Sequence, residues 1–136
     1  EKWAGGVRTL HGMHVHGFPN CFILSNPQSG FTASYPHMLN EQAKHLAYVI
    51  RKGIDAKWNA LEVTPEAEQA WIDQCIAKAR DVGDFFENCT PGYYNNEGKI
   101  GERSAQDGFY GGGPVEFIKI LETWRAADAL EGLERR

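Results

Sequence analysis

The sequence lacks the features that mark several broad classes of protein. Its 136 residues contain no apolar run long enough to cross a lipid bilayer and no basic-then-apolar segment typical of a secretion signal. Basic residues are too few for a nucleic-acid surface, with 14 Lys and Arg against 18 Asp and Glu and a net charge of −4. We therefore expect a cytoplasmic protein with no membrane and no nucleic acid among its partners.

Cysteine is also scarce. The three cysteines, Cys21, Cys75 and Cys89, are odd in number and share no close spacing, which excludes a disulfide framework and a zinc knuckle as first interpretations. Reduced and mostly buried thiols are expected instead. The sequence also contains no G-x-G-x-x-G, Walker A, H-E-x-x-H or G-x-S-x-G motif, so it assigns no catalytic residue.

What is present suits one soluble domain, but an incomplete one. Hydrophobic residues make up 42% of the chain and charged residues 24%, which is ordinary for a globular protein. The chain starts at Glu1 without a Met, and its first residues read like the middle of a domain. We expect a fragment.

An apolar run of strand length, Cys21 to Ser25, leads directly into the turn sequence Asn-Pro-Gln-Ser-Gly at 26–30. A run of this length bounded by turn residues predicts a buried strand. One strand cannot pair its own backbone groups, so it is expected to join strands outside this chain.

Three segments have the apolar spacing of amphipathic helices. They are residues 36–53, with Gly53 as a C-cap, a second helix that begins at Pro65 with Thr64 as N-cap, and a third that begins at Pro114. The predicted apolar faces are Leu39, Ala43, Leu46 and Ile50 in the first helix, Ala67, Trp71, Cys75, Ala79, Val82 and Phe86 in the second, and Phe117, Leu121 and Trp124 in the third.

Two further segments are expected to lack regular structure. Residues 88–113 contain seven glycines, and a loop of this length in a compact domain is usually functional or mobile. The polar tail at 130–136 is expected to be frayed.

Three places could carry chemistry. The spacing H-x-x-H-x-H at His11, His14 and His16 suggests a metal, but no acidic residue lies in that segment, so surface or core histidines are the favoured interpretation. The glycines before Pro114 could hold an anion at a helix start, or simply form a turn. The strand–turn–helix unit at 22–42 is the best candidate ligand site, because ligands gather at the carboxyl ends of strands.

The stretch GFPNCFILSNPQS, followed by Gln42 in a helix, resembles the C-terminal portion of class I Baeyer–Villiger monooxygenases, in the flavin-containing monooxygenase superfamily. The segments RTLHGMHVHGFPN, TPEAEQAWI and NCTPGYYNNEGK are similar to the same family, in the same order. The resemblance implies a predominantly helical α/β fragment, the C-terminal part of a flavoprotein with two dinucleotide-binding domains. Residues 1–53 would be the last strand and helix of the FAD-binding domain, and 54–136 a C-terminal helical segment with a long glycine-rich loop.

By that resemblance, Pro27, Gln28 and Ser29 lie beside the flavin. Asn26 stands where the family usually has glycine, and Asn tolerates left-handed backbone well enough for the turn to survive. Asn95 corresponds to a family asparagine in the loop that closes over the nicotinamide cofactor, while Thr90 replaces a tryptophan found in several relatives. Four residues are implied to line the substrate pocket: Phe31, Thr32, Tyr35 and Met38.

The implied activity is insertion of an oxygen atom next to a ketone, giving an ester or lactone, with FAD and NADPH as cofactors of the full-length protein. The nucleotide-binding motifs and catalytic arginine of the family lie upstream of the matched region. This chain is therefore expected to be inactive alone, to lack its cofactors, and to associate with the rest of the polypeptide or with itself. Two alternatives are a non-catalytic helical interaction module derived from such an enzyme and a small histidine-metal protein.

Overall fold

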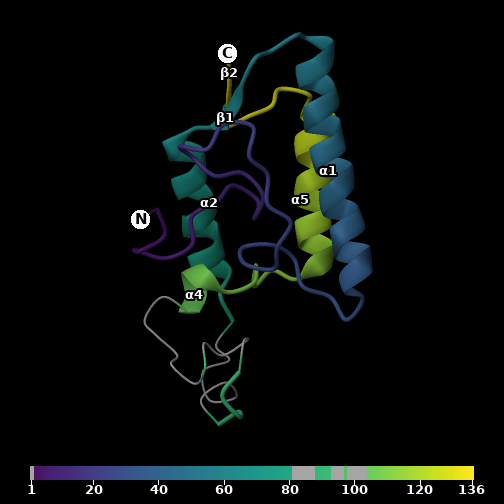
Figure 1. The fold of residues 1–136 in the computed structure, drawn as a ribbon. Helices are drawn as coiled ribbons and strands as arrows, with labels where there is room; N and C mark the ends of the chain where they lie inside the picture. Colours follow the sequence, from purple (N-terminus) through teal and green to yellow (C-terminus); the bar gives the residue numbers. More distant parts are fainter. Residues whose placement is uncertain (1, 81–87, 93–96, 98–103) are drawn as a thin grey trace.

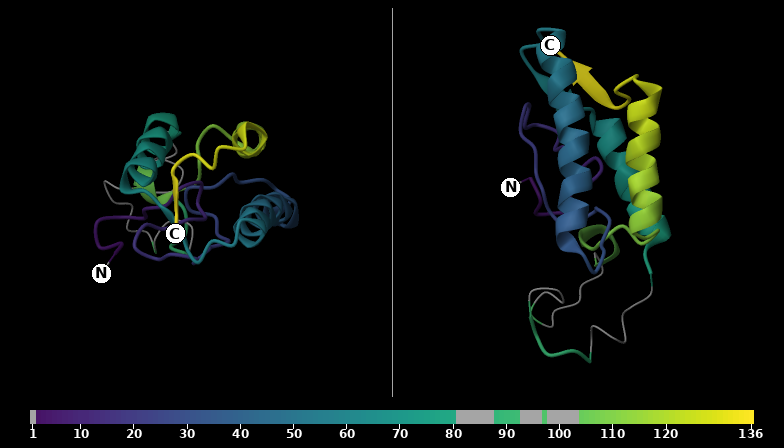
Figure 2. Two further views of the ribbon diagram at one scale, coloured as in Figure 1. Left: turned by 90° about the horizontal axis from the view of Figure 1, so that it is seen from above. Right: turned by 90° about the vertical axis from the view of Figure 1, so that its right-hand side faces the viewer.

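The computed structural model describes residues 2–80, 88–92, 97 and 104–136. Its elements, in chain order, are α1 (Tyr35–Asp55), β1 (Leu61–Val63), α2 (Pro65–Lys78), α4 (Ser104–Asp107), α5 (Pro114–Ala127) and β2 (Leu133–Arg135). Helices α1 and α5 lie side by side, and α2 faces them across the chain's N-terminal segment (Figure 1). Seen from above, the three long helices stand around that segment (Figure 2). Within the described ranges, none of these helices combines the length and apolarity needed to cross a bilayer.

Helix α1 confirms the first predicted helix but not its buried face or its end. The buried side chains are Met38, Glu41, Gln42, His45, Leu46 and Val49, whereas Ala43 and Ile50 are exposed. Leu46 is buried as predicted, but the predicted face was wrong at Ala43 and Ile50, because the helix buries polar Gln42 and His45, which a rule based on apolar spacing leaves outside. The predicted cap at Gly53 was wrong too, because the helix continues to Asp55 and the Ala56 N–H bonds the Lys52 carbonyl.

Helix α2 begins as predicted. The Thr64 hydroxyl accepts a hydrogen bond from the Ala67 N–H, and Pro65 fills the first turn. The helix ends at Lys78, earlier than the predicted apolar face, because Ala79 has extended backbone. Gly111 packs against this end so closely that a Cβ on it would lie 1.9 Å from the Lys78 carbonyl oxygen. The predicted helical positions Val82 and Phe86 lie outside the described residues.

The segment at 21–25 forms no strand within the described residues, and its predicted pairing with strands outside this chain stays a prediction. Phe22 forms only an isolated antiparallel bridge with His14, supported by a 2.9 Å hydrogen bond from the Ile23 N–H to the Met13 carbonyl. One short neighbour cannot build a ladder, so the segment forms no named strand among the described residues.

The predicted frayed tail was also wrong, because β2 pairs antiparallel with β1, with Val63 opposite Leu133. The reason is burial: Leu130 and Leu133 both join the hydrophobic core. The long segment 88–113 is likewise not wholly irregular, since it contains the short helix α4. Local composition could not show either feature, because each depends on packing against distant residues.

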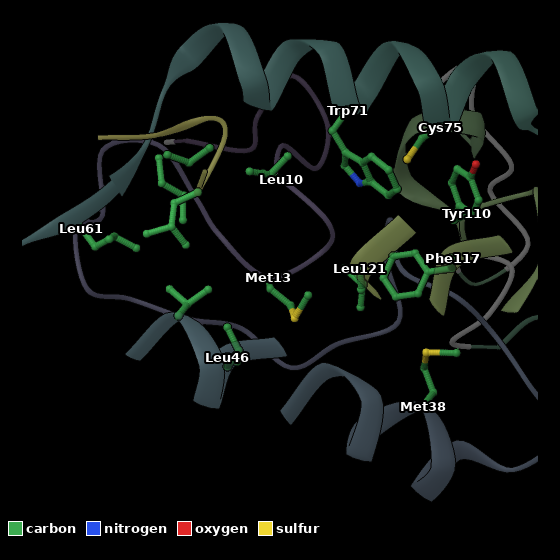
Figure 3. Packing of buried hydrophobic residues seen from close by; sticks show 14 residues of the cluster. Leu10, Met13, Met38, Leu46, Leu61, Trp71, Cys75, Tyr110, Phe117 and Leu121 are labelled. Atoms are coloured by element: carbon green, nitrogen blue, oxygen red, sulfur yellow. The ribbon is translucent and has the colours of Figure 1, made fainter. Parts of the chain in front are cut away.

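The core lies between α2 on one side and α1 on the other (Figure 3). Trp71 and Cys75 project from α2 toward Met38 and Leu46 of α1, with Met13 of the N-terminal segment between them. Both predicted parts of the chain contribute to this one core, so the boundary at residue 53 stays a prediction. The predominantly helical α/β class is confirmed.

The three cysteines are free thiols with different exposures. Cys75 is buried in the core, and burial raises the pKa of its thiol to about 12. Cys21 is exposed, so the expectation of mostly buried thiols was wrong for that residue.

Candidate functional site

The turn at Asn26–Ser29 leads from the bridged segment at Phe22 into α1. The Ser29 N–H donates to the Asn26 carbonyl at 3.1 Å, with Pro27 at the second position and a φ of 57° at Gln28 in the third. These are the features of a type II turn. Asn26 was expected to supply the left-handed backbone, but in this structure Gln28 does so.

The Gln28 side chain holds this turn in the interior. Its Oε1 accepts from the Thr9 N–H at 3.1 Å and the Thr9 hydroxyl at 2.6 Å. Its Nε2 donates to the carbonyls of Val7, at 2.8 Å, and Gln106, at 3.0 Å. The Gln28 backbone carbonyl accepts from the Trp71 indole at 3.1 Å, and its N–H donates to Gly108. The side chain and backbone of Gln28 together connect three distant segments, at residues 7–9, 71 and 106–108. The prediction that Gln28 contacts a cofactor stays a prediction.

Ser29 and Pro27 form the face of the turn that meets the N-terminal segment. The Ser29 hydroxyl lies 2.7 Å from the Ser25 carbonyl oxygen, to which it donates. Gly12, with a φ of 72°, packs so closely that a Cβ there would lie 2.9 Å from the Pro27 carbonyl and from the Ser29 Cβ. Sequence reasoning missed Gly12; the only signal was a glycine inside the RTLHGMH segment.

Three of the four predicted substrate residues gather at the surface just after the turn. Phe31, 44% exposed, stacks on Phe109 with ring centroids 4.3 Å apart. Tyr35 is 39% exposed, and the Thr32 hydroxyl accepts from the Ser34 N–H. Met38 lies apart from them in the core, where it faces Phe117 (Figure 3). Phe109, which the sequence did not single out, is therefore part of this surface.

The positive end of α1 adjoins the same surface. No described side chain caps the first turn at Ser34, and that turn contains no acidic residue. In this first turn Pro36 has no N–H and the His37 N–H donates to the Ser34 carbonyl, so it is the helix dipole that makes this end favourable for an electron-rich group. The start of α5 differs, because Glu116 lies in its first turn and accepts hydrogen bonds from Tyr110 and Lys78. That carboxylate disfavours the anion considered for the glycines before Pro114.

The predicted histidine set is split. His11 and His14 are buried with His45 of α1, whose ring centroid lies 5.6 Å from that of His11 and 5.8 Å from that of His14. His16 faces β1 instead, with Nδ1 2.9 Å from the Val63 carbonyl. Across the described part of the chain, no group of three His, Cys, Asp or Glu side chains is arranged to hold a metal ion.

Burial is the main cause of the lowered pKa values in this histidine cluster, defined as His11, His14 and His45. It lowers the pKa of His14 to about 4. Burial, with a contribution from His14, lowers the pKa of His11 to about 3. Burial, with contributions from His11, His14 and Arg125, lowers the pKa of His45 to about 2. The cluster is therefore neutral at physiological pH.

Asn95, the predicted nicotinamide contact, lies outside the described residues, so its role stays a prediction.

No protein-family model matches the chain. Among curated proteins, it is 47% identical to pentalenolactone D synthase from Streptomyces arenae, over 100% of this chain and 23% of that protein. It is 36% identical to the FAD-binding monooxygenase hmp7 of Hypomyces subiculosus, over 99% of this chain and 22% of that protein. It is 39% identical to Baeyer-Villiger monooxygenase ATR8 of Stachybotrys chlorohalonatus, over 98% of this chain and 21% of that protein.

Solved structures agree with these relatives. The polycyclic ketone monooxygenase of Thermothelomyces thermophila matches 98% of this chain and 22% of its own, with a TM-score of 0.82 and 31% identity. An oxidized steroid monooxygenase bound to NADP matches 98% and 23%, with a TM-score of 0.75 and 25% identity. The chain thus spans between a fifth and a quarter of the proteins it matches. Over its whole length, the chain is homologous to the FAD-binding and Baeyer–Villiger monooxygenases and has the fold of the corresponding portion of those enzymes.

Proposed function

We propose that this chain is the C-terminal portion of an FAD- and NADPH-dependent monooxygenase that inserts an oxygen atom next to a ketone, giving an ester or lactone. The observation that carries the proposal is the match over the whole chain to proteins described as FAD-binding or Baeyer–Villiger monooxygenases. A structural relative bound to NADP supports the second cofactor. The rest of the enzyme polypeptide, with its nucleotide-binding domains, is the proposed partner, and the cytoplasm the proposed location.

The residues around the turn fit a flavin. The turn at Asn26–Ser29 is held rigidly by Gln28, and the uncapped positive end of α1 follows it within a few residues. A rigid edge beside the positive end of a helix dipole suits a flat, electron-rich ring. Reduced flavin supplies the reactivity toward oxygen when it is bound. Pro27 would contact one edge of the ring, and Gln28 and Ser29, which are fully buried in this chain, would hold the turn beside it in place.

The surface beside the turn fits an apolar ketone. Phe31 and Tyr35 present aromatic rings to the outside, and the Thr32 hydroxyl lies between them in the sequence. Met38 would act from behind, by filling the core under Gly30, which it approaches closely. Asn95 would contact the nicotinamide cofactor from the glycine-rich loop. We propose that these residues position the ketone and exclude water from it, and that none acts as an acid, base or nucleophile.

The isolated chain would leave apolar surface uncovered. Four large hydrophobic side chains in the segment around the turn are exposed: Phe18, Leu24, Phe31 and Tyr35. Where exposed apolar side chains gather into one patch, the patch is typical of an interface. We expect the rest of the polypeptide to cover part of it, and the isolated chain to self-associate and to retain neither FAD nor NADPH.

The test uses a longer polypeptide that carries this chain at its C-terminal end. We expect the purified protein to show flavin absorption bands, to oxidise NADPH faster when a cyclic ketone is added, and to form the lactone, detected by mass spectrometry. A longer protein that binds no flavin and shows no ketone-dependent NADPH oxidation would contradict the proposal. The alternative, a non-catalytic interaction module, would then take its place.

A further inference from the structure

Gln42 connects helix α1 to the turn at Asn26–Ser29. It lies on the inner face of α1 with only 1% of its surface exposed. Its Nε2 donates to the Ser25 carbonyl at 3.0 Å, one residue before the turn begins. The contact joins the helix that follows the turn to the backbone that precedes it, so it fixes the turn from both ends.

The Ser25 carbonyl is a shared acceptor. It receives the Ser29 hydroxyl, at 2.7 Å, as well as the Gln42 amide. The Ser29 N–H in turn donates to the Asn26 carbonyl, closing the turn. Ser25 is therefore held by the turn and by the helix together, and Gln42 supplies the only one of these bonds to Ser25 that comes from a helix among the described residues.

The Gln42 amide is poorly satisfied for a buried group. Its Oε1 has no hydrogen-bond partner within the described residues, although the atom is buried. The Asn26 Oδ1 at the same turn is in the same condition. A buried, half-satisfied amide stabilises a fold less than an apolar side chain of similar shape does. Core stability alone would therefore favour methionine at position 42.

We propose that Gln42 is a positioning residue, which holds the Ser25–Ser29 backbone in the place required for ligand binding rather than contributing to fold stability. This inference rests on the proposed function, because the ligand at the turn is taken to be the flavin. The bond at issue is the donor bond to Ser25. Its loss would allow the turn to move relative to the start of α1.

The test compares Gln42→Met with Gln42→Glu in the longer, flavin-binding polypeptide. Methionine keeps the length of the side chain and removes both polar atoms. Glutamate keeps the shape but, when ionised, cannot donate to Ser25. Gln74→Met is the matched control, because Gln74 is an exposed glutamine on α2.

We expect Gln42→Met to keep or raise the melting temperature of the flavin-free protein. The peptide containing residues 25–29 should exchange its amide hydrogens faster, and flavin should bind roughly three- to tenfold more weakly, as the loss of one net hydrogen bond predicts. Gln42→Glu should show the same faster exchange at pH 7.5 and above, where the glutamate is ionised and cannot donate to Ser25. Gln74→Met should match the unmodified protein.

Unchanged exchange at 25–29 in Gln42→Met would overturn the inference, as would a large fall in melting temperature with no change in flavin affinity. The exchange measurement is made without flavin, so it decides the role of Gln42 even if the unmodified protein binds none. If the unmodified protein binds no flavin, the proposed function is contradicted, but the role of Gln42 in holding the turn is still decided by the exchange measurement.

Discussion

Lowering the pH should unfold this chain through its histidine cluster. His11, His14 and His45 are buried among aromatic rings, with Trp71 4.9 Å from His11 and Trp124 4.8 Å from His45. Four of their ring nitrogens have no hydrogen-bond partner within the described residues. No described carboxylate contributes to their pKa shifts, and the nearby charge of Arg125 opposes protonation of His45.

The lowered pKa values determine the direction in which the free energy of unfolding changes with pH. In the folded chain these histidines take up protons only near pH 4, 3 and 2, whereas in the unfolded chain they do so near pH 6.5. The unfolded state therefore binds more protons between these limits. The free energy of unfolding is therefore highest above pH 6.5, where the three histidines are neutral in both states, and it falls progressively as the pH drops below 6.5.

The expected loss of unfolding free energy on acidification is large for a domain of this size. Each group costs about 1.4 kcal/mol of folding free energy per pH unit below its unfolded pKa, so three groups cost about 4 kcal/mol per unit. Between pH 7.5 and 5 the total is roughly 6 kcal/mol, against a typical stability of about 5–15 kcal/mol. We expect cooperative acid unfolding near pH 5.

The assay is urea unfolding at a series of pH values, followed by tryptophan fluorescence, because Trp71 and Trp124 contact the cluster directly. The variant His45→Leu should reduce the slope of unfolding free energy against pH by about a third, since it removes one of three groups. His37→Leu, at an exposed position on the same helix, is the control. A slope that is the same in His45→Leu and the unmodified chain would refute the reasoning.

Three further substitutions test the packing. Gly12→Ala should destabilise the fold by about 1–3 kcal/mol, because its Cβ would meet the Pro27 carbonyl, whereas Gly5→Ala, in open space, should have little effect in the same urea assay. Thr64→Ala removes the N-cap of α2 and should cost about 1 kcal/mol, measured by thermal unfolding. Leu133→Ala, in the buried part of the β1–β2 pair, should cost about 2–5 kcal/mol, and a cost near zero would show that the tail does not pack as described.

Part of the candidate site was predictable from the residues alone. Pro27 within Asn-Pro-Gln-Ser-Gly marked the turn, and the helix after it was predicted within a residue of its observed start. The ordered resemblance to the Baeyer–Villiger monooxygenases was confirmed by relatives along the whole chain. These features are local, or are written in the order of the residues, so they do not require knowledge of what packs against them.

The roles of Gln28 and Gln42 were not predictable in the same way. Their partners, Thr9, Gln106 and Ser25, are distant in sequence, and glutamine carries no signal of burial. The substrate residues behaved similarly: Phe31 and Met38 both read as apolar lining, but the fold exposes one and buries the other.

By itself, the sequence determined the start of the second helix through Thr64 and Pro65, the existence of three amphipathic helices, and the family to which the chain is homologous. Only the tertiary structure decided which face α1 buries, that residues 61–63 pair with 133–135, and that the 21–25 segment forms a single bridge. The physical reason is the range of the interactions. Caps and helical spacing act within one or two turns of the chain, whereas burial and strand pairing depend on which distant residues the whole fold brings into contact.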